Sequence, residues 1–103
     1  MTETTPEEIH RAKLNLETAQ MPWTDMQRYF ASGAALYVSP ELDLVEVGYQ
    51  MSVDNAGQIG QWMAAGAFGK VSDEQASLWL EQDAMLWAVV VSPWVLVQPV
   101  TQG

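Results

Sequence analysis

The chain has 103 residues, no cysteine, and thirteen acidic side chains against four basic ones, which gives a net charge of −9. The length suits one domain, and the lack of cysteine excludes disulfides, thiolate zinc sites and a cysteine nucleophile. Phosphate backbones and anionic membranes are bound mainly through lysine and arginine, so the charge argues against both as partners. We expect one acidic domain over residues 1–103, with residues 1–4 and 99–103 loose, that binds neither nucleic acid nor membranes.

The first predicted element is a helix that begins at Pro6, where the missing N–H costs nothing. Thr5 and Glu8 have the spacing of a capping box, in which each side chain satisfies a backbone N–H of the other. The acidic start differs from the basic, then apolar, start of a secretory signal, which favours a cytoplasmic protein. Within the helix one narrow apolar stripe has the pattern of a core-facing side, and it consists of Ile9, Ala12, Leu16 and Ala19.

Pro22 interrupts this helix, and a second helix is expected from the following residues to Gly33, which ends it. Thr24 and Gln27 have the spacing of another capping box. Met26, Tyr29 and Phe30 supply the apolar side of this helix.

The hydrophobic period then changes from helical to alternating. ALYVS predicts a short strand, PEL a turn, and DLVEVGYQMSV a longer strand, so we expect a hairpin. In the longer segment the apolar residues alternate with Glu46, Gln50 and Ser52, which is typical of a strand with one face in water. The apolar set is Val45, Val47, Tyr49, Met51 and Val53.

Two more helices are expected between this hairpin and the C-terminal segment. Asp54 or Asn55 can cap the first, and Gly66 ends it; its inward side chains are Ile59, Trp62 and Met63. Ser72 and Gln75 form a capping box for the second, whose buried stripe is Ala76, Trp79 and Leu80.

The C-terminal segment LWAVVVSPWVLVQPV carries no charge. Its strongly apolar part is shorter than the roughly 20 residues of a membrane-spanning helix, and its valines favour a strand. Both faces of that strand are apolar, so both must be covered. Pro93 cannot donate to a ladder, so Ser92 and Pro93 indicate a bulge at which the two faces exchange side chains.

These elements predict an α+β fold: a small antiparallel or mixed sheet of about three strands packed with about four helices, in the order ααββααβ. Few helices remain for the second face of the sheet. Either the chain covers its last strand alone, or a second copy covers it as a homodimer. The candidate interface residues are Trp87, Val89, Val91, Trp94 and Leu96.

No motif points to catalysis, a cofactor or a metal. His10 is the single histidine and has no cysteine or second histidine near it, so a Ser-His-Asp arrangement or a histidine-rich metal site has nothing to build on. A carboxylate-dependent hydrolase would need Glu41, Asp43, Glu46 or Asp54 to converge on a cation. Five tryptophans either pack in the core or line a small-ligand pocket, for which Trp62, Trp79 and Trp87 are the candidates.

Four segments carry a resemblance to a known family: LNLETAQMPW, SPELDLVEVGYQ, QWMAAG and LWAVVVSPWVLVQ. They resemble the bacterial family of small single-domain proteins catalogued as domain of unknown function 2288. The resemblance implies a bacterial cytoplasmic protein and brings no catalytic or ligand-binding residues. The chain departs from that pattern at Gly48 and Gly57, where alanine or a polar residue is expected.

The sequence therefore favours a non-enzymatic interaction module that self-associates through its apolar C-terminal strand. The alternative is a ligand-binding module with a tryptophan-lined pocket. A hydrolase that depends on carboxylates and a metal ranks third.

Overall fold

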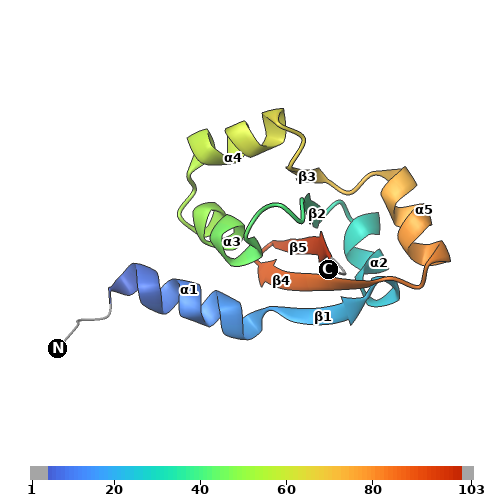
Figure 1. Ribbon diagram of the computed structural model, residues 1–103, viewed down its shortest axis with the longest axis horizontal. Coiled ribbons are helices and arrows are strands. Elements are labelled where there is room, and N and C mark those ends of the chain that lie inside the picture. Colours follow the sequence, from blue (N-terminus) through green and yellow to red (C-terminus); the bar gives the residue numbers. More distant parts are fainter. Residues whose placement is uncertain (1–4, 101–103) are drawn as a thin grey trace.

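A computed structural model describes residues 5–100, which form five helices around one five-stranded mixed sheet (Figure 1). The fold is therefore α+β as expected, with more strands and one more helix than the sequence pattern indicated. In chain order the elements are α1 (Pro6–Glu17), β1 (Ala19–Pro22), α2 (Trp23–Ala31), β2 (Ala35–Val38), α3 (Leu44–Ser52), α4 (Ala56–Ala64), β3 (Phe68–Lys70), α5 (Asp73–Glu81), β4 (Met85–Val91) and β5 (Trp94–Pro99).

The sheet has the strand order β1-β4-β5-β2-β3. Strands β4 and β5 are the long central pair, joined as an antiparallel hairpin across Ser92 and Pro93. Strand β2 runs parallel to β5, and the short strands β1 and β3 close the two edges in antiparallel pairing. The predicted single final strand is thus two strands, since the proline that suggested a bulge lies in a reversal of the chain.

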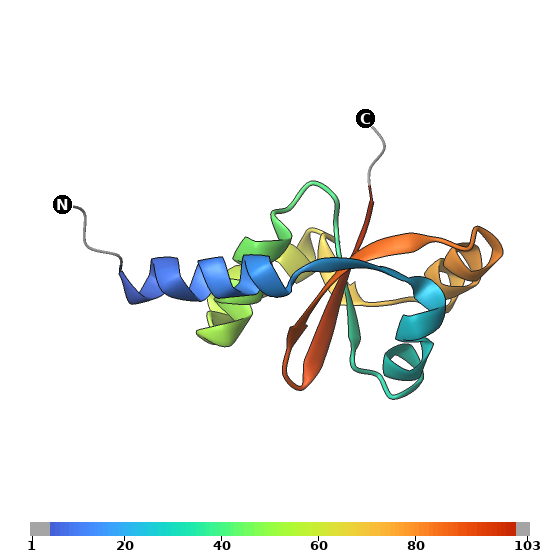
Figure 2. The same cartoon turned by 90° about the horizontal axis from the view of Figure 1, so that it is seen from below.

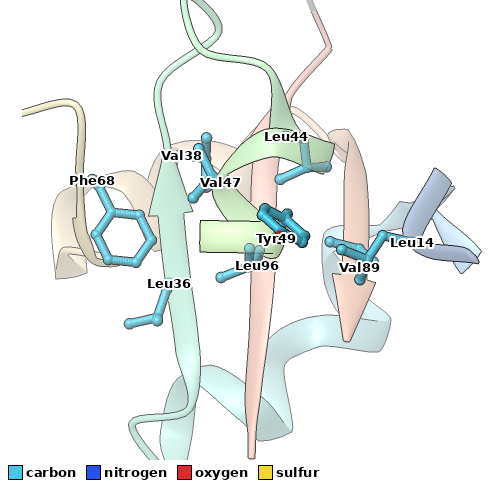
Figure 3. Packing of buried hydrophobic residues seen from close by; sticks show 9 residues of the cluster. All are labelled: Leu14, Leu36, Val38, Leu44, Val47, Tyr49, Phe68, Val89 and Leu96. Carbon is cyan, nitrogen blue, oxygen red and sulfur yellow. The ribbon is translucent and has the colours of Figure 1, made fainter. Parts of the chain in front are cut away.

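Helices cover both faces of this sheet. On one face α1, α3 and α4 lie over a cluster that includes Leu14, Val47, Val89 and Leu96 (Figure 3). On the other face α2 and α5 lie over a second cluster, which includes Trp23, Trp79 and Val97. The chain itself therefore covers most of the C-terminal segment on both faces, although Val90 near the β4–β5 turn stays 56% exposed.

Most of the predicted helix ends are present in the structure. Thr5 caps α1 with the full capping box, Asn55 caps α4 by accepting from the Gln58 N–H, and Ser72 caps α5 with the second box. Gly33 follows α2 and Gly66 follows α4, both at positive φ, a conformation that glycine adopts without steric cost. The predicted Thr24 capping box is wrong, because α2 begins at Trp23 with Pro22 as its cap residue.

The segment Leu44–Ser52 is a helix, which corrects the predicted long strand. Asp43 begins it by accepting hydrogen bonds from the N–H groups of Val45 and Glu46. Leu44, Val47 and Met51 are also spaced for one side of a helix, and that side packs on the sheet. The alternating valines fit both readings, and the cap together with tertiary packing decides for the helix.

The side of helix α1 that faces the core is opposite to the apolar stripe that the sequence pattern predicted. Leu14 is the buried residue of this helix, whereas Ile9 and Leu16 are 57% and 85% exposed. The N-terminal part of α1 also projects beyond the sheet (Figure 2). The predicted stripe is therefore a solvent-facing surface.

The C-terminal end of the chain belongs to regular structure further than expected. Pro99 belongs to β5 and pairs with Leu86, although it was expected in a loose tail. The remaining residues of the predicted loose ends, 1–4 and 101–103, lie outside the described part. Among residues 5–100, no helix combines the length and apolar character needed to cross a membrane.

Candidate binding groove

A half-open groove of about 640 Å³ lies between α1, the junction of α3 with α4, and the turn of the β4–β5 hairpin. Its floor and walls are mainly apolar, and charged groups stand at its rim. Met63 and Val90 are 55% and 56% exposed there, and they belong to a contiguous apolar lining rather than standing singly on the surface. The apolar lining consists of Leu14, Met51, Ala56, Ile59, Met63, Val90, Val91 and Trp94; the polar lining includes His10, Lys13, Glu17, Ser52, Asp54 and Ser92.

Helix α1 forms one wall because Leu14 anchors it to the body of the protein. Leu14 packs over Gly48 of α3 and beside Val91 of β4. A Cβ atom at Gly48 would lie 3.7 Å from Leu14 Cδ1 and 3.5 Å from Val91 Cγ2, both ordinary contact distances. Alanine, which together with polar residues the family resemblance leads us to expect there, would therefore fit without moving this wall.

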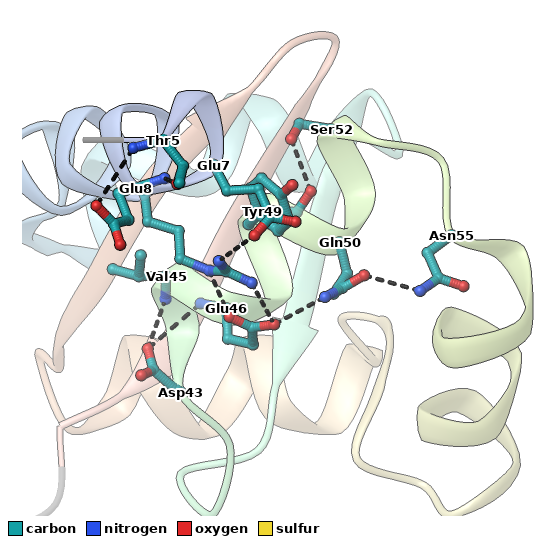
Figure 4. Close-up of polar contacts among 11 residues, drawn as sticks. Thr5, Glu7, Glu8, Asp43, Val45, Glu46, Tyr49, Gln50, Ser52 and Asn55 are labelled. Carbon is teal, nitrogen blue, oxygen red and sulfur yellow. Dashed lines mark hydrogen bonds and ion pairs between the residues drawn. The ribbon is translucent and has the colours of Figure 1, made fainter. Parts of the chain in front are cut away.

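A chain of polar contacts ties the three helices of the groove together along its outer side (Figure 4). Arg11 of α1 donates two hydrogen bonds to the Glu46 carboxylate of α3, at 2.9 and 3.1 Å. Gln50 donates to the same carboxylate at 2.7 Å, and Asn55 at the start of α4 donates to the Gln50 side-chain oxygen at 2.8 Å. A two-pronged arginine–carboxylate pair fixes orientation as well as distance, so this chain sets the position of α1 relative to α4.

The aromatic ring of Tyr49 sits beneath this polar chain. The Arg11 guanidinium lies 4.1 Å from the ring centroid, and the His10 ring meets it edge-on at 5.4 Å. An arginine over an aromatic face is attracted by the electrons of the ring. The Arg11 guanidinium is therefore fixed by two partners, the Tyr49 ring and the Glu46 carboxylate.

These contacts also shift the acid–base properties of the same residues. The hydrogen bonds from Arg11 and Gln50 hold the pKa of Glu46 below its ordinary value. Burial raises the pKa of Tyr49, and a hydrogen bond with Glu7 adds to that effect. Both shifts favour the protonation states that Glu46 and Tyr49 have at neutral pH, so these two groups contribute to the network in those states.

Helix α4 is the more weakly held wall. It contains no buried residue, no charged residue and two glycines, Gly57 and Gly60. Gly60 lines the groove, and a Cβ atom there would meet nothing within 4 Å. Asp54, which joins α3 to α4, has a φ of 57°, a left-handed conformation uncommon for residues other than glycine. This wall is therefore the one that can adapt to an occupant.

The predicted interface residues share one face of the sheet but differ in accessibility. Val89 and Leu96 are 1% and 0% exposed inside the chain, so they are not offered to a second copy. Trp87 is half-buried beside the same cluster, away from the groove. Val91 and Trp94, at the hairpin turn, line the groove. Of the five residues, only these two lie at the candidate site.

The three predicted pocket tryptophans do not come together. Trp79 is buried between α2 and α5, where it contacts Trp23 with 5.0 Å between ring centroids. Trp62 packs from α4 against the opposite cluster, and Trp87 lies on β4. The tryptophan that lines the groove is Trp94.

The acidic residues considered for a cation site have other partners or lie apart. Asp43 caps α3, Glu46 binds Arg11, and Asp54 stands at the far rim of the groove. Within residues 5–100, no three histidine or carboxylate groups gather closely enough to hold a metal ion.

The groove residues that the sequence did not single out are mostly methionines and small residues. Met51 was placed on a strand, and Met63 was expected to face inward. Met63 lies on α4, which has no buried residue, whereas Met51 lies on α3, which has four, so the sequence carried no signal common to the two. Whether the groove-facing sides of α3 and α4 stay open depends on where α1 docks. Nothing in the sequence near Leu14 indicates that this residue makes the docking contact.

Comparisons with known proteins agree with this fold. The solution structure of PA1075 from Pseudomonas aeruginosa is similar, with 42% sequence identity and a TM-score of 0.81 over 99% of this chain and 93% of that chain. No curated protein matches. The model of a protein family of unknown function, DUF2288, matches residues 9–99. The chain therefore belongs to the DUF2288 family, as its four characteristic segments indicated.

Proposed function

We propose that this protein is a non-catalytic binding module whose site is the groove between α1, α4 and the β4–β5 turn. The observation that carries the proposal is the apolar lining left open to solvent, with Met63 and Val90 each more than half exposed. A volume of about 640 Å³ falls in the range of small-ligand pockets and of seats for an amphipathic segment.

The chemistry of the lining indicates what the groove accepts. Met51 and Met63 are unbranched and polarizable, so they adjust to occupants of different shape. Trp94 offers a broad apolar surface at one end. The polar groups stand at the rim, which suits an occupant with an apolar body and polar edges.

The sequence left two kinds of binding open, namely binding of a small ligand and self-association. The same groove could serve as the site for either. Its residues Val91 and Trp94 belong to the apolar segment expected to self-associate. The net charge of −9 supports a partner other than nucleic acid or an anionic membrane. The absence of cysteine supports a cytoplasmic setting.

The test is binding of Nile red, an uncharged apolar dye, to wild type and two charge variants at low protein concentration. We expect Met63→Glu to weaken binding by about tenfold, since a carboxylate at the groove floor must be desolvated. Met85→Glu is the matched control, because Met85 is similarly exposed and lies outside the groove. Equal dye affinity in the two variants would refute the proposal.

A further inference from the structure

We propose that the occupant of the groove is helix α1 of a second copy of this chain, in a reciprocal two-fold dimer. This inference rests on the proposed function, since it names the partner of the same groove. Within residues 5–100, two apolar surfaces that involve α1 are open to solvent. One is the groove, and the other is the outer stripe of Ile9, Ala12 and Leu16.

The positions of these two surfaces on α1 fit a closed dimer. At about 100° per residue, the outer stripe lies on the side of α1 opposite Leu14, and the groove-lining residues lie between the two sides. Figures 1 and 2 show α1 extending along the edge of the molecule, where its outer side is free. Two copies can therefore enclose their two α1 helices in one antiparallel layer. Each helix then has its Leu14 side on its own body and its outer stripe in the partner's groove.

Such an arrangement is isologous: the same two surfaces meet twice, and no apolar surface of either kind is left for a third copy. A contact of the stripe alone would be small, because it consists of two large side chains and one alanine. In the two-fold dimer each stripe enters a groove, so the stripe–groove contact is made twice, with the two α1 helices meeting between the two bodies.

Charge favours this surface for contact between copies. Two chains of net charge −9 repel each other, so self-association requires the least acidic part of the surface. The stretch from Ile9 to Leu16 carries Arg11 and Lys13 and no acid, and α4 carries no charge at all. Lys13 flanks the outer stripe, so in the dimer it reaches the rim of the partner's groove, where Glu17 and Asp54 stand.

The experiment is molar mass by light scattering over about a hundredfold range of concentration, combined with Nile red binding. We compare the wild type with Leu16→Glu in the stripe, Met63→Glu in the groove, and Leu78→Glu as control. Leu78 is 48% exposed on α5, on the other side of the sheet, and all three variants add one negative charge. All three positions are exposed, so the variants are expected to fold.

The dimer predicts about twice the 11.4 kDa chain mass for the wild type and Leu78→Glu, and the mass of one chain for the other two variants. Leu16→Glu keeps an open groove and therefore binds the dye at every concentration, while Met63→Glu does not. The wild type loses dye as its concentration rises, because the partner's helix displaces it. Lys13→Glu should weaken self-association about tenfold more than Lys70→Glu, which makes the same charge change on β3.

Three results would overturn the dimer. The wild type could have the mass of one chain throughout, or a dimer could persist in Leu16→Glu and Met63→Glu. A dimer lost only in Leu16→Glu would mean that stripe meets stripe and the groove is not the seat. In each case the dye comparison of Met63→Glu with Met85→Glu decides separately whether the groove binds apolar molecules.

Discussion

The replacement Leu14→Ala tests how α1 is held against the sheet. Leu14 is the buried residue of α1, 5% exposed, and its side chain packs between Gly48 and Val91. Removing three carbons from a buried leucine costs about 2–5 kcal/mol, and the site borders the groove, so solvent can enter the space left behind. We therefore expect the lower part of that range, about 2–3 kcal/mol of unfolding free energy.

Two ways of losing that energy can be told apart. Helix α1 is N-terminal and packs mainly on α3, so it can detach while the rest of the protein stays folded. If the free energy that docks α1 is smaller than the cost of removing the Leu14 side chain, detachment limits the fall in global stability. Urea unfolding followed by tryptophan fluorescence reports the global loss, because α1 contains no tryptophan. Hydrogen exchange of the α1 amides reports detachment. Leu16→Ala, 85% exposed on the same helix, is the control; at a concentration where the single chain is the species present, it should change stability by less than about 0.5 kcal/mol.

A cost below about 1 kcal/mol for Leu14→Ala, with unchanged exchange of the α1 amides, would contradict the anchoring of α1 by Leu14. That result would mean that the Arg11–Glu46 pair, rather than the leucine, holds the helix. It would also remove the basis for treating α1 as a fixed wall of the groove.

Three further predictions concern single residues. The folded pKa of Glu46 is lowered, so its stabilising effect is present above about pH 4.5 and is lost as the pH falls through the folded value. The stability difference between wild type and Glu46→Gln, from urea unfolding, should shrink from pH 6 to about pH 3; a constant difference would contradict the ion pair with Arg11. Gly57→Ala in α4 should raise stability by roughly 0.5–1 kcal/mol, since a Cβ there approaches only Asn55 Oδ1, at 3.8 Å; a lower melting temperature would contradict this. Asp83→Gly should also raise the melting temperature, by the equivalent of about 1 kcal/mol, because Asp83 has a φ of 49°; no change would mean that its side chain compensates.

Local signals predicted the helix ends well because each depends on residues close in sequence. The Thr5–Glu8 and Ser72–Gln75 boxes need only the right side chains three positions apart, and both are present. The segment Leu44–Ser52 was misassigned because Val45, Val47, Tyr49 and Met51 satisfy a period of two, while Leu44, Val47 and Met51 also satisfy a helical spacing. The edge strands β1 and β3 were missed because three or four residues carry too short a pattern to recognise.

The candidate site was predicted least well, for a physical reason. The exposed stripe of Ile9, Ala12 and Leu16 and the buried Leu14 are both compatible with a helix that packs on a sheet. Their roles are decided by contacts distant in sequence, such as the hydrogen bonds from Arg11 to Glu46 and the packing of Leu14 on Gly48. The apolar C-terminal segment was recognised correctly as needing cover on both faces. The source of that cover could not be read from the segment itself.

The most direct test of the groove as the binding site is an amide chemical-shift map. Spectra of the protein are recorded with and without Nile red at a concentration where one chain is the species present. If the dye binds in the groove, the largest shifts fall on groove residues, foremost Met51, Ile59 and Met63. Shifts concentrated instead between α2 and α5, at Phe30 and Leu80, or absent throughout, would contradict it.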